Sequence, residues 1–158
     1  MNREQYMIEI QRTWQDDMSQ REQISNATLG LIGEVEEFEQ DHVIGELGDV
    51  AFYAFTLARL LGHDPREVAH DGTPMNRIAA RIAERIKKLE YHRPLGQTQY
   101  AICMGDLYGL LDNMIAAIKR KAICGVTGRD FFGEVLAANA YKLRARYPDG
   151  FVPGGGVR

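Results

Sequence analysis

The chain has 158 residues, of which 45% are hydrophobic, and this suits a single domain (1–158) that folds without disulfides. A formal net charge of −3 excludes the large positive field that duplex-binding surfaces need, so we expect no nucleic-acid partner. The two cysteines lack a CxxC spacing, no signal peptide is seen, and the longest apolar stretch, 50–58, is too short to span a bilayer; we therefore expect a soluble, cytoplasmic protein that does not bind membranes.

Apolar periodicity predicts three helices in the first part of the chain. The first ends before the polar stretch 20–23 and carries one apolar face. The second runs from a cap at Ser25 or Asn26 to Asp41, and the third covers about 44–61. The faces expected to be buried are Tyr6, Met7, Ile10, Trp14 and Met18 on the first helix, and Leu29, Ile32, Val35 and Phe38 on the second.

The second part of the chain also reads as helical. Residues 64–67 resemble the start of a short helix, and the break at 72–74 precedes a basic helix with an apolar stripe. A long apolar helix follows over about 97–122, and Thr127 can cap a last helix that ends near Arg146, before a glycine-rich mobile tail, 151–158. Because no segment alternates with period 2 between turn signals, we predict an all-α bundle without a sheet. The stripe on the basic helix is Ile78, Ile82, Ile86 and Leu89.

Two pairs of acidic residues dominate the chemistry of the sequence. Glu34 and Glu37 are three apart on the second helix, and Glu46 and Asp49 are three apart on the third, so each pair lies on one helix face. If the two helices pack across their short connection, four carboxylates approach one another and require cations. Hard oxygen ligands in such a cluster suit Mg²⁺ or Mn²⁺ together with a phosphate substrate.

A solvated helix surface is the alternative reading of each pair. Two features argue against it. Residues 47–54 are apolar nearly all round, so at least one of the acids beside them should be partly buried and need a partner. Glycines within both helices also predict close backbone approach; they are Gly30, Gly33, Gly45 and Gly48.

These motifs are similar to those of a known family. LGLIGEVEEFE followed by GELGDVAFY resembles the ExxE and ExxD motifs of the MazG-like, all-α nucleoside triphosphate pyrophosphohydrolases, and EVLAANAYKLRARYPDGF resembles the end segment of their small, phage-type members. The resemblance implies Mg²⁺-dependent hydrolysis of an NTP or dNTP to the monophosphate and pyrophosphate, with Mn²⁺ as a substitute. It also implies self-association as a dimer or tetramer.

The resemblance implies roles for individual residues. Carried over by position, Glu34, Glu37, Glu46 and Asp49 would hold the metal. Glu36 or Glu37 would orient or deprotonate the attacking water. The end segment offers Asn139, Lys142 and Arg146 to the phosphates, with ordinary surface polarity as the alternative. Tyr53 and Trp14 would contact the nucleoside, with core packing as the alternative.

The stretch 73–129 matches this family poorly. RIAERIKKLE echoes LIGEVEEFEQ, which favours a degenerate second copy, and an unrelated helical insertion is the alternative. Lys87 and Cys103 stand where a second copy would need acids, so this stretch would bind metal poorly. Its cations, Arg81, Arg85, Lys87 and Lys88, would either face the acidic half across the substrate or simply solvate a helix.

Two other functions compete with this reading. Di-iron carboxylate proteins also place acids on facing helices, but they need histidine in an ExxH spacing, which neither Glu34 nor Glu46 provides. The second alternative is a catalytically inactive helical oligomer that binds nucleotides or a protein partner.

Overall fold

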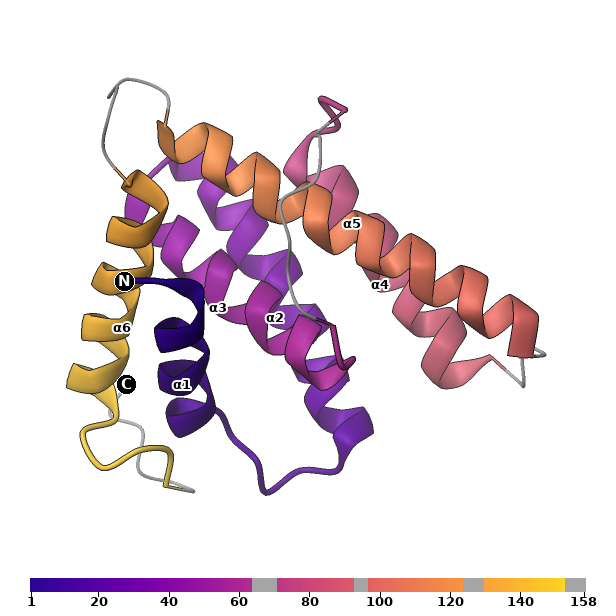
Figure 1. Cartoon of the computed structure of the whole chain (residues 1–158), viewed down its shortest axis with the longest axis horizontal. Coiled ribbons are helices and arrows are strands. Elements are labelled where there is room, and N and C mark those ends of the chain that lie inside the picture. Colours follow the sequence, from indigo (N-terminus) through magenta and orange to yellow (C-terminus); the bar gives the residue numbers. More distant parts are fainter. Residues whose placement is uncertain (64–70, 93–96, 124–129, 153–158) are drawn as a thin grey trace.

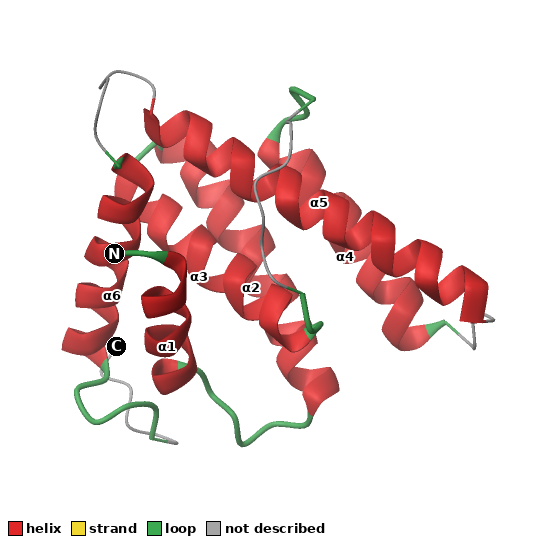
Figure 2. Cartoon of the chain, in the orientation of Figure 1, coloured by secondary structure: helices red, strands yellow, loops and turns green. Residues whose placement is uncertain are grey.

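Six α-helices make up all the regular structure in the described part of the chain (Figures 1 and 2). The computed structural model describes residues 1–63, 71–92, 97–123 and 130–152. The all-α prediction is confirmed over these residues. The helices are α1 (Arg3–Thr13), α2 (Gln20–Asp41), α3 (Ile44–Leu60), α4 (Met75–Tyr91), α5 (Gln97–Ile123) and α6 (Phe131–Arg146).

The α2–α3 hairpin is the centre of the fold. The connection is only two residues long because His42 ends α2 in the left-handed conformation, with φ of 54°. Helices α1 and α6 pack against each other and against α3. Helices α4 and α5 form a second hairpin, packed on α2 and α3 respectively (Figure 1). The stretch that matches the family poorly therefore contains α4 and α5.

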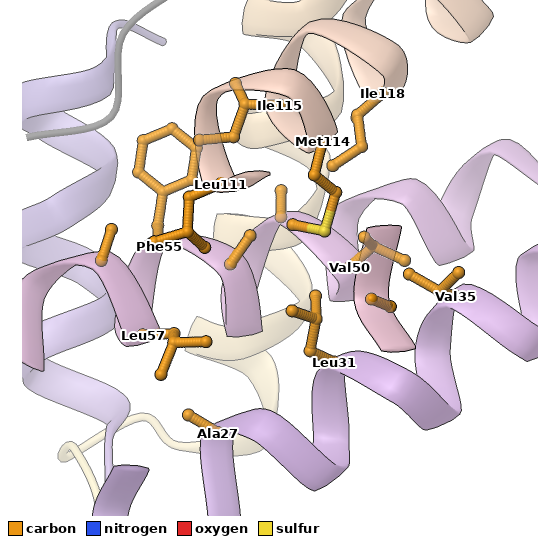
Figure 3. Close-up of a cluster of buried hydrophobic side chains, with 14 of the residues drawn as sticks. Ala27, Leu31, Val35, Val50, Phe55, Leu57, Leu111, Met114, Ile115 and Ile118 are labelled. Carbon is orange, nitrogen blue, oxygen red and sulfur yellow. The ribbon is translucent and has the colours of Figure 1, made fainter. Parts of the chain in front are cut away.

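One apolar core joins these elements (Figure 3). Leu31 and Val35 of α2 meet Val50 and Phe55 of α3, and α5 covers them from the other side. The α5 side chains in this cluster are Leu111, Met114, Ile115 and Ile118.

Helix α2 differs from its prediction at the start and in its buried face. It begins at Gln20, because Ser19 and Glu22 form a capping box, and not at a cap on Ser25 or Asn26. Leu29 is 70% exposed and Ile32 is also exposed, so half of the predicted stripe is wrong. The buried face consists of Ile24, Ala27, Thr28, Leu31, Val35 and Phe38.

The other predicted boundaries mostly agree with the structure. Helix α1 ends at Thr13, so Met18 lies in the following connection and not on the helix. Helices α3, α4 and α5 begin and end within a few residues of their predicted limits. Helix α6 is capped by Asp130, whereas Thr127, the short element at 64–67 and the tail from residue 153 lie outside the described residues.

Helix α5 contains a segment, Thr98–Lys121, that is long and apolar enough to cross a membrane by length and composition alone. The prediction that no segment reaches this length is therefore wrong. Part of this segment builds the core, and 44% of its most apolar 18-residue window is buried within the protein. Since core helices pass the same test, this is weak evidence for a membrane span.

Candidate metal centre

Helices α2 and α3 bring three carboxylates together. Glu34 of α2 and Glu46 and Asp49 of α3 each offer one oxygen, and these oxygens all lie within 4.8 Å of one another. The three side chains are partly buried, since α3 is apolar around the acids it carries. The antiparallel hairpin thus produces the convergence of acidic helix faces that the i, i+3 spacing predicts.

The fourth predicted acid, Glu37, lies in the same cavity but is exposed and outside the three-acid cluster. The cavity has a volume of about 440 Å³, which is within the range of small-molecule sites. Besides the four acids, its lining includes two cationic side chains and a group of aromatic rings: Lys142, Arg146, Trp14, Phe52, Tyr53, Tyr147 and Phe151.

Crowding of negative charge changes the ionisation of Glu34. Burial, followed by repulsion from Asp49, Glu37 and Glu46, raises the pKa of Glu34 to about 7, although Lys142 acts in the opposite direction. The cluster therefore does not carry all its negative charge at neutral pH without compensation. A divalent cation held by carboxylate oxygens would supply that compensation, so the donor set fits Mg²⁺ or Mn²⁺.

Asp49 is held by hydrogen bonds to both of its oxygens. Asn139 Nδ2 donates to Oδ1 at 2.9 Å, and Lys142 Nζ donates to Oδ2. Both donors come from α6, which packs against α3 at this point. Helix α6 therefore orients one acid of the cluster and brings a positive charge beside it.

An aromatic group forms another part of the cavity wall. The Phe52 and Tyr53 ring centroids lie 5.2 Å apart, and Trp14 lies 5.8 Å from Phe52. Trp14 is only 4% exposed, and its Nε1 donates to Gln23 Oε1 at 2.9 Å. Trp14 lines the cavity with little exposed surface, whereas the partly exposed rings of Phe52 and Tyr53 offer more surface to a ligand.

Glycine allows close approach at two of the four predicted positions. A Cβ on Gly30 would lie 2.2 Å from the ring of Tyr53, and one on Gly48 would lie 2.8 Å from Cβ of Asn139. At Gly33 no atom lies within 4 Å of such a Cβ, and at Gly45 the nearest atom is at an ordinary contact distance of 3.8 Å. The prediction of close backbone approach is therefore wrong for these two glycines.

The structure does not bring every predicted site residue to this cavity. Glu36 lines a different cavity, between α2 and α4, and accepts a hydrogen bond from Gln40. Asn139 is buried behind Asp49 and is absent from the cavity lining. The lining includes residues that sequence reasoning missed, such as Phe52 and Phe151, because an apolar ring in an apolar helix or near a chain end carries no chemical signal.

A larger cavity of about 520 Å³ lies between α4 and α5 and contains most of the basic residues of α4. These cations do not face the acidic cluster, so they form no basic wall across a shared site. Arg85 pairs with Asp106 at 3.0 Å, and Lys88 lies 3.7 Å from Glu84, so much of the positive charge is already compensated. The three-acid cavity is the stronger candidate because its charges are not balanced.

A scan against protein-family models, a search of curated proteins and a search of solved structures each found no match to this chain. The family resemblance therefore stays a prediction from the motifs.

Proposed function

We propose that this protein is a MazG-like, Mg²⁺-dependent nucleoside triphosphate pyrophosphohydrolase, which releases a nucleoside monophosphate and pyrophosphate. The observation that carries the proposal is the cluster of Glu34, Glu46 and Asp49, with ligand atoms within 4.8 Å of one another. The same cavity contains cationic side chains and aromatic rings. A metal-bound triphosphate joined to a nucleoside needs all three kinds of group.

Glu34, Glu46 and Asp49 would hold the cation, with Glu37 at the rim of the cavity as a fourth acid. A bound Mg²⁺ polarises phosphate oxygens, offsets charge on the leaving pyrophosphate and lowers the pKa of a bound water. Mn²⁺ prefers similar oxygen ligands and is expected to substitute.

Lys142 and Arg146 would bind the phosphates. They follow Asn139 on α6 by three and seven residues, and both line the cavity. Lys142 is the cation beside Asp49, so it lies where a phosphate held by the cluster would arrive. Arg146 is exposed and offers a planar donor group that suits phosphate oxygens.

We assign the orientation of the attacking water to Glu37. Glu37 lines the cavity without belonging to the three-acid cluster, which leaves its carboxylate available to accept a proton from water. Glu36, the alternative from the sequence, lines another cavity. The water oxygen bonds to phosphorus, the phosphoanhydride bond to the leaving pyrophosphate breaks, and the water proton passes to Glu37.

The ring surfaces of Phe52 and Tyr53 would contact the nucleoside.

We also propose that the chain self-associates, as the resemblance implies. Large apolar side chains remain exposed on several helices, including Ile8, Leu29 and Tyr141.

The test is a product analysis over a panel of NTPs and dNTPs with Mg²⁺. Equal amounts of monophosphate and pyrophosphate, abolished by EDTA and restored by Mg²⁺ or Mn²⁺, are expected. Release of diphosphate and orthophosphate would show that a different bond is cleaved. Nucleotide binding without any product would instead favour an inactive nucleotide-binding protein.

A further inference from the structure

We infer that Tyr6 is a positioning residue for the metal centre and acts through Asn139 on Asp49. The inference rests on the proposed metal-binding role of the acidic cluster. Tyr6 belongs to α1, far along the chain from both partners, and the sequence predicts for it only a place on the apolar face of the first helix. Its hydroxyl donates to Asn139 Oδ1 at 2.6 Å and lies 3.3 Å from the carbonyl oxygen of Gly48, the residue before Asp49.

The three side chains form one directed chain of hydrogen bonds. Asn139 Nδ2 donates to Asp49 Oδ1 at 2.9 Å, so the amide oxygen of Asn139 must face the other way, toward Tyr6. If the amide were turned round, its oxygen would face a carboxylate and repel it. The tyrosine hydroxyl, as a donor, favours the orientation in which Asn139 offers its NH₂ group to Asp49.

Burial makes this hydrogen-bond chain specific. Tyr6 is 0% exposed and Asn139 is 3% exposed, so neither polar group has a surface position from which water could easily replace its partner. The ring of Tyr6 packs edge-on against Phe55, with centroids 5.6 Å apart. A phenylalanine would keep that packing, which means that the hydroxyl serves the amide and not the core.

Gly48 of α3 packs closely against Asn139. A Cβ there would lie 2.8 Å from Cβ and 3.1 Å from Nδ2 of Asn139, so α3 and α6 approach each other at a distance that only glycine permits. Helices α1, α3 and α6 thus meet behind Asp49. This gives Asn139 a role different from the phosphate contact expected from sequence, because it is absent from the cavity lining and its amide is committed to Tyr6 and Asp49.

The primary test is Mn²⁺ binding by the full chain without nucleotide, measured by calorimetry or by electron paramagnetic resonance of free Mn²⁺. In Tyr6→Phe the ring remains but Asn139 loses its donor, and we expect Kd to rise about 10-fold, as for other residues that orient metal ligands. The matched control is Ile10→Val, a buried change one turn further along α1 that touches none of these hydrogen bonds. Its Kd should equal that of the wild type, even if both variants unfold at lower temperature.

A second pair of variants tests the same arrangement without changing Tyr6. Gly48→Ala forces Asn139 to move and should weaken Mn²⁺ binding, whereas Gly45→Ala meets only Val43 at 3.8 Å and should not. A Tyr6→Phe protein that binds Mn²⁺ as tightly as the wild type overturns the inference alone. A wild type that binds no Mn²⁺ overturns both this inference and the proposed function. A wild type that binds Mn²⁺ in a Tyr6-dependent way but releases no pyrophosphate overturns only the proposed reaction.

Discussion

Gly30 of α2 lies directly against the ring of Tyr53 of α3, so that a Cβ at residue 30 would come within 2.2 to 2.6 Å of three ring atoms. The ring occupies the space that a side chain on α2 would otherwise fill. This contact fixes where one aromatic wall of the acidic cavity stands. It also supplies a matched pair of positions, because Gly33, one turn further along α2, has no atom within 4 Å of its hypothetical Cβ.

Gly30→Ala should displace Tyr53 and raise KM for the nucleotide at least several-fold, with a smaller effect on kcat. Gly33→Ala should leave both unchanged. Both changes remove a helix-interior glycine worth about 1 kcal/mol in helix propensity, so Gly33→Ala should stabilise the protein while Gly30→Ala loses that gain to the collision. Steady-state kinetics and urea unfolding measure the two effects. Identical KM values for the two variants would show that Tyr53 does not contact substrate.

Metal-free protein should lose stability as the pH rises from about 4.5 to 7, through the ionisation of Glu34. The folded-state pKa of Glu34 is about 7, against an ordinary value of 4.5, so the folded protein binds this proton more strongly than the unfolded chain does. Stability from this group therefore falls between those two values and levels off above pH 7. Since Glu34 is only partly buried and water screens the repulsion, we expect a change of roughly 1 kcal/mol.

Urea unfolding in EDTA at several pH values measures this dependence. Glu34→Gln should remove the pH-dependent fall in the free energy of unfolding. Glu36→Gln, which removes an exposed acid outside the cavity, should keep that fall. If the unfolding free energy of Glu34→Gln depends on pH as that of the wild type does, burial and the neighbouring carboxylates do not raise the pKa of Glu34.

The ion pair between Glu9 and Arg144 should connect α1 to α6 in a pH-dependent way. Arg144 donates to Glu9 from Nε at 3.0 Å and from Nη2 at 2.5 Å, and this hydrogen bonding lowers the pKa of Glu9. The stabilisation is present above the ordinary pKa and is lost as the pH falls through the lowered one. Glu9→Gln should therefore lower Tm at pH 7, and the difference from the wild type should shrink as the pH falls below 4.5, the ordinary pKa of the carboxyl group. Lys87→Gln, which removes an exposed pair, should leave Tm unchanged.

Helices with a strong apolar period were predictable from sequence. Ile78, Ile82 and Ile86 recur at helical spacing, and all three are buried on α4 as predicted. The start of α2 was also present in the sequence as the Ser19 to Glu22 capping box, but those polar residues read as an interruption because the first buried side chain comes only at Ile24.

The buried face of α2 was harder to predict because packing, and not hydrophobicity, decides it. The small residues Ala27 and Thr28 are buried, whereas Leu29 is left exposed. A ranking by hydrophobicity selects Leu29 and Ile32 in place of Thr28 and Leu31, which places the first half of the stripe about 100° too far round the helix.

The acidic cluster could be predicted to the level of helix faces. Spacing alone puts Glu34 and Glu37 on one face, but neighbouring Glu36 and Glu37 can be told apart only when the packing of α2 is known. The contact of Tyr6 with Asn139 joins residues 133 positions apart, and no local pattern in a single sequence announces it.

The most direct test of the central claim is Mg²⁺-dependent pyrophosphate release by the wild type and by Asp49→Asn, which keeps the shape of the side chain but removes its charge. We predict that the wild type converts an NTP or dNTP to monophosphate and pyrophosphate and that Asp49→Asn is slower by about 100-fold or more, with unchanged helical content. The exposed variant Glu36→Gln should remain within about twofold of the wild type. Near-normal turnover by Asp49→Asn, or no pyrophosphate from any nucleotide with the wild type, would contradict the claim.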